Sequence, residues 1–250
     1  MTDLTPKPEF ILVEPQMGEN IGAAARAMWN FGFERMRLVD PRDGWPNPRA
    51  GALASGAGRV LDAAAVFATT EEATADLHYV YATTARSREM TKTVFTPEAA
   101  AADIIRRHAL GEKIGILYGR ERTGLENEDV LRAHAIITVP VNPEFPSLNL
   151  AQCVLLLAYE LRRQIDDTPP EVYQTGKSTL ADVGQVDRML SHLIEELEEA
   201  EFFFPPEKKG SMQLNLRNLF RRAPLTDQDV RTLHGLIRAL TGKRQNPRKE

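Results

Sequence analysis

The chain has 250 residues, of which 42% are hydrophobic, and a formal net charge of −4. This length allows one large domain or a medium domain with an extension. No apolar run approaches the ~20 residues that span a bilayer, and the polar residues 1–9 do not resemble a secretory signal. The single cysteine, Cys153, excludes an intramolecular disulfide. The composition therefore predicts a cytoplasmic protein with no membrane contact.

Charge is unevenly distributed along the chain. Residues 205–250 hold 11 Lys or Arg against 4 Asp or Glu, a balance of +7, whereas the preceding residues hold 20 against 31, or −11. A basic segment on an acidic chain is typical of nucleic-acid binding. A solvated terminal tail has the same composition, so both interpretations stay open at this point.

The first part of the chain alternates predicted strands with predicted helices. Asn20 is a candidate N-cap for the first helix, and Thr96 caps a later one that has Pro97 at its first position. This alternation favours βαβ units and a mostly parallel sheet. The predicted strands are residues 10–13, 36–39 and 80–83, and the predicted helices are residues 21–30, 50–65 and 97–108.

Two further strands are predicted in the middle of the chain, each followed by an unusual loop. Residues 114–118 are apolar throughout and end at residues 119–125, a turn with two glycines and three charges. Residues 135–139 lead into the proline-rich loop 140–149, which precedes an apolar helix over 150–161. Open α/β sheets bind ligands at the carboxyl ends of their strands. The sequence therefore predicts the functional site at these two loops.

The last part of the chain changes character. Residues 166–178 are polar and contain Pro169, Pro170 and Gly176, which indicates a linker. An amphipathic helix follows over about 180–197, and two more are predicted at about 211–221 and 226–241. We therefore expect an α/β domain over residues 1–165, a linker over 166–178 and an all-helical extension over 179–250.

Three motifs, in this order, resemble the signature motifs of the SpoU branch of the SPOUT methyltransferases. They are Asn-Ile-Gly-Ala-Ala-Ala-Arg at residues 20–26, Gly-Arg-Glu with Gly-Leu at residues 119–125, and Asn-Pro-Glu with Ser-Leu-Asn-Leu-Ala at residues 142–151. The resemblance covers about residues 9–165. It implies a mostly parallel α/β sheet with a deep C-terminal trefoil knot, in which the helix over 150–161 passes through the loop around Arg120. The knot follows from the resemblance alone, because chain connections rarely thread loops.

The resemblance also implies an activity. Members of this family transfer a methyl group from S-adenosylmethionine to a ribose 2′-hydroxyl of RNA, as homodimers whose domains complete each other's active sites. Residues 216–222 and 233–237 further resemble a subgroup that modifies the tRNA anticodon loop, where cytidine or uridine 32 is the expected target. The implied cofactor is S-adenosylmethionine, and the implied partners are tRNA and a second copy of the chain.

The same resemblance places the cofactor on three strand-end loops. We expect Gly119 to permit close approach of the ligand, because a Cβ atom there would block it. An ordinary turn at the end of a strand would also use glycine. The expected cofactor-binding residues are Thr83, Thr84, Ala85, Gly119, Arg120, Gly124, Val139, Pro140, Ser147, Leu148 and Asn149.

The candidate catalytic residues come from all three motifs. The family assigns activation of the ribose hydroxyl to the arginine that is Arg26 here. Because a guanidinium is not normally deprotonated, a grip on a neighbouring phosphate is the alternative role. Glu121 could accept a hydrogen bond from Arg120 or from a backbone N–H, and Asn149 could simply cap the helix that follows it. The full set is Arg26, Asn20, Glu121, Ser147 and Asn149.

Other functions compete with this interpretation. A sibling enzyme could methylate the tRNA D-loop or ribosomal RNA, and a non-catalytic RNA-binding protein could keep the same fold. A nucleotide-hydrolysing enzyme is disfavoured because residues 115–124 lack the Gly-Lys-Ser/Thr ending of a phosphate loop. The chemistry requires no metal. The five histidines show no ligand spacing with Cys153, which we expect in the core.

Overall fold

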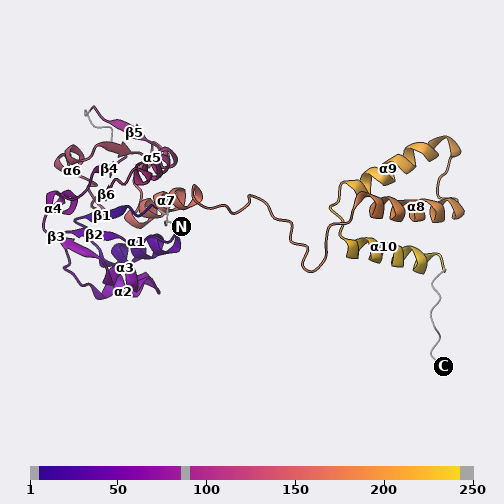
Figure 1. Cartoon of the computed structure of the whole chain (residues 1–250), viewed down its shortest axis with the longest axis horizontal. Helices are drawn as coiled ribbons and strands as arrows, with labels where there is room; N and C mark the ends of the chain where they lie inside the picture. Colours follow the sequence, from indigo (N-terminus) through magenta and orange to yellow (C-terminus); the bar gives the residue numbers. More distant parts are fainter. Residues whose placement is uncertain (1–5, 86–90, 243–250) are drawn as a thin grey trace, which may run out of the picture. The chain divides into compact units, whose positions relative to one another are not determined.

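The structure is a computed structural model that describes residues 6–85 and 91–242. It divides into two compact units, Met1–Thr168 and Pro169–Glu250 (Figure 1). We describe each unit by itself, and call them the sheet unit and the helical unit.

A parallel sheet forms the centre of the sheet unit. Its strand order among the described residues is β3-β2-β1-β6-β4-β7-β5, and all neighbouring strands run parallel. The mostly parallel sheet predicted from the sequence is therefore confirmed. The strands are β1 (Glu9–Val13), β2 (Met36–Val39), β3 (Ala65–Phe67), β4 (Tyr79–Thr83), β5 (Thr93–Phe95), β6 (Ile114–Tyr118) and β7 (Ala135–Ile137).

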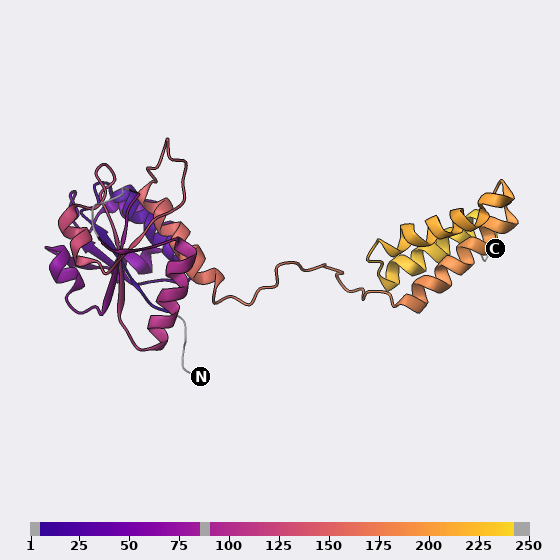
Figure 2. The ribbon, with the colours of Figure 1, turned by 90° about the horizontal axis from the view of Figure 1, so that it is seen from above.

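Helices cover both faces of this sheet (Figure 2). On β6, Ile116 and Tyr118 face the first group of helices and Leu117 faces the second. Burial on both faces explains why the central strands are apolar without alternation. The first group is α1 (Gly18–Asn30), α2 (Pro48–Ala54), α3 (Gly58–Asp62), α5 (Pro97–Ala109) and α7 (Leu150–Arg163), and the second is α4 (Thr70–Thr74) and α6 (Asn127–Arg132).

The helix starts show which sequence signals were decisive. Thr96 caps α5 with Pro97 in its first turn, and the Asn149 side chain caps α7, as predicted. The prediction for Asn20 is wrong. Helix α1 begins at Gly18 with Met17 as its N-cap, so Asn20 lies inside the first turn. Its side chain donates instead to the carboxylate of Glu121, from a distant loop that the local sequence does not reveal.

The helix predicted over residues 50–65 is also wrong. Helix α2 ends at Ala54, because Ser55 has a φ of 45° and Gly56 a φ of 93°. The short helix α3 follows, and then β3 pairs with β2 in parallel. Three-residue strands such as β3 and β5 carry too little periodicity to be recognised, and only their pairing with a neighbouring strand defines them.

The helical unit contains α8 (Val183–Glu199), a 3-10 turn (Pro206–Lys208), α9 (Lys209–Arg221) and α10 (Asp227–Leu240). Its small core buries Met189 and Leu190 of α8 against Val230 and Ile237 of α10. The predicted amphipathic helix is confirmed, and its start is fixed by a capping box between Asp182 and Gln185. In the described part of the chain, no helix is both long and apolar enough to cross a membrane.

Candidate active site

Three loops meet at the carboxyl edge of the sheet. Strand β4 lies between β6 and β7, so the chain leaves three neighbouring strands at one place. The amide of Thr84 donates to the Ile137 carbonyl at 3.1 Å, and the Thr138 hydroxyl donates to the Thr84 carbonyl at 2.9 Å. The Thr83 hydroxyl donates to the Leu117 carbonyl at 2.8 Å. These bonds hold the three strand ends together, as Brändén-type α/β sites require.

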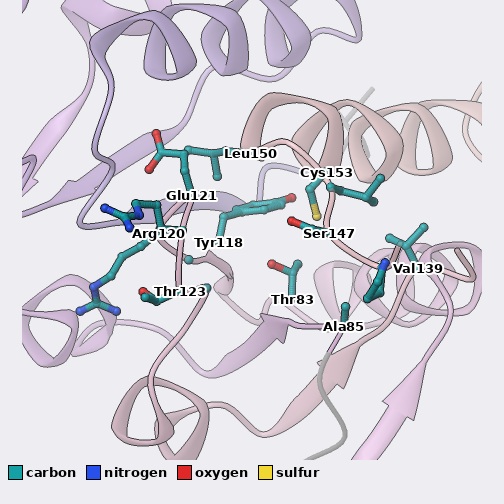
Figure 3. Close-up of a pocket in the computed structure, with 15 residues that line it drawn as sticks. Thr83, Ala85, Tyr118, Arg120, Glu121, Thr123, Val139, Ser147, Leu150 and Cys153 are labelled. Carbon is teal, nitrogen blue, oxygen red and sulfur yellow. The ribbon is translucent and has the colours of Figure 1, made fainter. Parts of the chain in front are cut away.

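The loops enclose a cavity of about 320 Å³ (Figure 3). This volume is within the range of ~300–1,000 Å³ that is usual for small-molecule sites. Its wall combines the ends of β4 and β6, the loop after β7 and the first turn of α7. The lining residues are Thr83, Ala85, Tyr118, Gly119, Arg120, Glu121, Arg122, Thr123, Gly124, Val139, Pro146, Ser147, Leu148, Leu150 and Cys153.

Most of the expected cofactor residues lie on this wall. Three of them, Thr84, Pro140 and Asn149, are not among the residues that line the cavity. Thr84 instead bonds the two neighbouring loops, and Asn149 faces the start of α7. The expected residues that line the cavity are Thr83, Ala85, Gly119, Arg120, Gly124, Val139, Ser147 and Leu148.

A hydrogen-bond network joins the three sequence motifs. The Glu121 carboxylate accepts from the amides of Gln16 at 2.8 Å and Met17 at 3.2 Å, and from the Asn20 side chain at 2.9 Å. The Asn20 oxygen then accepts from the Asn149 side chain at 3.0 Å. Glu121 thus places a negative charge at the start of α1, where the free N–H groups favour it. The three motifs form one physical unit.

Asn149 has two jobs in this network. Its Oδ1 atom accepts from the amides of Ala151 at 2.9 Å and Gln152 at 3.4 Å, which caps α7. Its Nδ2 atom donates to Asn20. The capping role predicted as the alternative is therefore confirmed, and the side chain also fixes α7 to α1.

Arg120 is held by a partner that the sequence did not indicate. Its side chain is 10% exposed and pairs with Glu14 at 2.8 Å and with Asp129 at 3.3 Å. The expected partner, Glu121, is bonded to the start of α1 instead. Glu14 follows β1, which neighbours β6 in the sheet, and only this strand order brings it close. Arg120 therefore fastens its loop to β1 and α6.

Gly119 is needed for a reason different from the expected one. A Cβ atom at this position would lie 2.2 Å from the Gly124 carbonyl carbon and 2.2 Å from the Leu125 amide nitrogen. Such contacts are with backbone, which cannot rotate away. Gly119 lets the loop close on itself through the Arg120–Gly124 bridge. The expectation that a side chain there would obstruct only the ligand is wrong.

Arg26 lies apart from this cavity. It is exposed on α1 and is not among the residues that line the wall. Within residues 6–85 and 91–242, its guanidinium makes no ion pair or hydrogen bond. The structure of one chain thus brings Asn20, Glu121 and Asn149 together but leaves Arg26 facing solvent.

Two lining residues were missed, because both look like ordinary core residues. Tyr118 is the last residue of β6 and is fully buried, and its hydroxyl has no hydrogen-bond partner among the described residues. Burial raises the pKa of this phenol well above its ordinary value. Cys153 lies one turn into α7, and burial raises the pKa of its thiol to about 11. Their signal was positional: both lie within one helical turn or one residue of a motif.

The parallel sheet, with a pocket at its carboxyl edge, defines an α/β ligand-binding protein of the type that carries enzymes. The SpoU rRNA Methylase family matches residues 8–159, and the C-terminal domain of the tRNA methyltransferase TrmJ matches residues 184–249. The chain therefore belongs to the SpoU methylase family, and within it to the TrmJ subgroup.

Individual relatives agree with this placement. The tRNA (cytidine/uridine-2'-O-)-methyltransferase TrmJ of Yersinia pestis is 32% identical over 96% of this chain and 93% of its own length. The tRNA (cytidine/uridine/adenosine-2'-O-)-methyltransferase TrmJ of Pseudomonas aeruginosa is 33% identical over 91% of both chains. The crystal structure of TrmJ from Z. mobilis is 49% identical over 94% of this chain and 99% of its own, with a TM-score of 0.82.

Proposed function

We propose that this chain transfers a methyl group from S-adenosylmethionine to a ribose 2′-hydroxyl of tRNA. Its target is a cytidine or uridine of the anticodon loop, with position 32 expected from the tail motifs. The observation that carries the proposal is the cavity where the second and third motifs of a methylase family form one wall. The names of relatives that match both units supply the RNA class. A tRNA substrate implies a cytoplasmic enzyme.

The cavity fits the cofactor. S-adenosylmethionine supplies an activated methyl group and brings an adenine, a ribose and an amino-acid tail. The strand-end loops offer backbone groups, and Thr83, Ser147 and Tyr118 offer neutral hydroxyls. The unpartnered Tyr118 hydroxyl is a buried polar atom that a ligand would satisfy. We assign the cofactor to Thr83, Ala85, Gly119, Gly124, Val139, Ser147 and Leu148.

Arg26 supports the proposal that the enzyme is a homodimer. An exposed arginine without an ion pair in the described chain is available to an anionic partner. We assign it to a cavity completed by the second subunit, where its planar fork would grip a phosphate beside the target ribose. Membership of the family also supports the trefoil knot, with α7 passed through the loop around Arg120.

The chemistry relies on positioning. The ribose oxygen must reach the methyl carbon in line with the breaking C–S bond, and holding the reactants so can contribute ~7–11 kcal/mol to rate acceleration. The Glu121–Asn20–Asn149 network serves this by fixing α1 and α7 relative to the loop after β6. Arg26 then lies on a helix whose start is anchored to the cavity wall.

The helical unit supplies a second RNA contact in this proposal. Arg217 and Arg222 of α9 and Arg238 of α10 make no ion pair within the described residues, whereas Arg221 and Arg231 pair with Asp187 and Asp227. Free guanidinium groups can neutralise phosphates and release counterions. The basic tail predicted to bind nucleic acid thus has three candidate contacts.

The test is methyl transfer with purified protein. Labelled S-adenosylmethionine and bulk tRNA should give 2′-O-methylated tRNA, and cells lacking the protein should lose that methyl group from the anticodon loop. Transfer to the D-loop or to ribosomal RNA would favour a sibling enzyme. Absence of transfer to any RNA, with RNA still bound, would favour the non-catalytic protein.

A further inference from the structure

Two fully buried tyrosines on neighbouring strands differ in one respect. The Tyr81 hydroxyl on β4 donates to the Asp103 carboxylate of α5. The Tyr118 hydroxyl on β6 has no partner in the described part of the chain. A buried polar group without a partner lowers the stability of the folded state, and native proteins rarely keep one without a reason. Tyr118 therefore requires an explanation that Tyr81 does not.

The Tyr118 side chain is held in a fixed position beside the cavity. Its ring stacks on Phe10 with centroids 6.0 Å apart and planes 3° from parallel. Figure 3 shows its hydroxyl directed towards the part of the cavity formed by Ser147 and Cys153. The hydroxyl is therefore a fixed hydrogen-bonding atom on the wall of the cavity.

The surroundings of this hydroxyl are neutral. Burial raises the pKa of Tyr118 and that of Cys153, so phenol and thiol both keep their protons at neutral pH. The Thr83 hydroxyl is committed to the Leu117 carbonyl. The charged groups of the wall, Glu121 and Arg120, are bonded to other elements. A neutral polar atom of a ligand fits here, whereas a charged one would lose its hydration without an ionic partner.

We propose that the Tyr118 hydroxyl hydrogen-bonds the adenosine portion of S-adenosylmethionine. The adenine and ribose carry only neutral polar atoms, whereas the sulfonium and the amino-acid tail carry the charges. The inference rests on the proposed function for the identity of the ligand. It adds a recognition residue that lies before the glycine loop rather than within it.

The experiment compares Tyr118→Phe with the wild type in full-length protein. Calorimetry measures affinity for S-adenosylmethionine and for 5′-deoxy-5′-methylthioadenosine, which keeps the adenosine and lacks the amino-acid tail. Loss of one hydrogen bond should weaken both ligands by a similar factor, roughly 3- to 10-fold. The melting temperature of the ligand-free variant should equal or exceed that of the wild type, because no protein partner is lost.

Tyr81→Phe is the matched control. It removes the same atom from an equally buried ring, but leaves Asp103 without one of its donors. Its melting temperature should fall, and its affinity for both ligands should not change. The two variants should therefore show opposite patterns.

Three results would overturn the inference. Unchanged affinities in Tyr118→Phe would mean that the hydroxyl does not touch the ligand. Weaker binding of S-adenosylmethionine alone would place the contact on the tail. A fall in melting temperature as large as that of Tyr81→Phe would reveal a partner within the protein. Failure of the wild type to bind S-adenosylmethionine would instead contradict the proposed function.

Discussion

The two units of this chain use their charged side chains differently. In the sheet unit, Arg37, Arg107 and Arg120 are mostly buried, and each is paired with carboxylates. In the helical unit, Arg222 and Arg238 are exposed and make no ion pair among the described residues. Paired, buried charges fix the shape of a site, whereas exposed and free charges can bind an anionic surface. The comparison suggests that one unit holds a small ligand and the other holds RNA.

The largest effect should come from Gly119, where the sheet unit is least tolerant. Gly119→Ala adds a methyl group that meets the backbone of Gly124 and Leu125, so the loop must open. We expect no measurable cofactor binding and a fall of ~1–3 kcal/mol in unfolding free energy. Calorimetry and thermal unfolding measure the two effects.

Gly51→Ala is the control for this change, since a Cβ atom there meets nothing within 4 Å on helix α2. It should leave binding intact and stabilise the protein slightly. Normal cofactor binding by Gly119→Ala would show that the loop is not the ligand site.

Arg26 should give the next largest effect, confined to turnover. Arg26→Ala should lower the rate of methyl transfer by at least ~100-fold, the scale of a lost catalytic group. Cofactor affinity should change little, because Arg26 does not line the cavity of its own chain. Arg132→Ala, on the opposite face of the sheet and paired with Glu71, should have no effect on either quantity. Near-normal turnover of Arg26→Ala on saturating tRNA would remove it from the active site.

The sequence predicted much of this architecture, for identifiable reasons. Strands β2 and β6 were bounded correctly, because burial on both faces gives an uninterrupted apolar run. The caps Thr96 and Asn149 were recognised because capping depends on residues next to each other in the chain.

What escaped the sequence depends on contacts between distant residues. The Arg120–Glu14 pair spans 106 positions, and the Glu121–Asn20 bond spans 101. Neither partner could be chosen before the order of β1 and β6 was known. Gly119 was correctly selected but wrongly explained, because its nearest obstacle is the return of its own loop.

The helical unit should lose affinity for RNA in proportion to its free charges. In the variant Arg217→Gln/Arg222→Gln/Arg238→Gln, each lost phosphate contact should flatten the plot of log affinity against log salt by ~0.7–0.9 units. Arg231→Gln, which removes an arginine already paired with Asp227, should change the slope less. Binding titrations over a salt series measure both. An unchanged slope in the triple variant would mean that these arginines are merely solvated.

A smaller effect should distinguish the two units by pH. Burial lowers the pKa of His234, and His192, Arg238 and Arg188 lower it further. Its Nδ1 atom lies 2.9 Å from that of His192, which itself lies 3.7 Å from Glu196. Because the unfolded chain binds the proton more tightly, the helical unit should lose stability as pH falls below ~6.5. Circular dichroism melts at pH 7.5 and 5.5 should show this, and His234→Gln should remove most of it.

The division of labour between the units is tested most directly by removing one of them. Residues 1–168 and the full-length protein should bind S-adenosylmethionine with equal affinity, because every residue that lines the cavity precedes Thr168. The shorter chain should bind tRNA more weakly, with a flatter dependence of log affinity on log salt. Equal tRNA affinities and equal salt slopes would contradict the account, because the sheet unit alone would then hold the RNA.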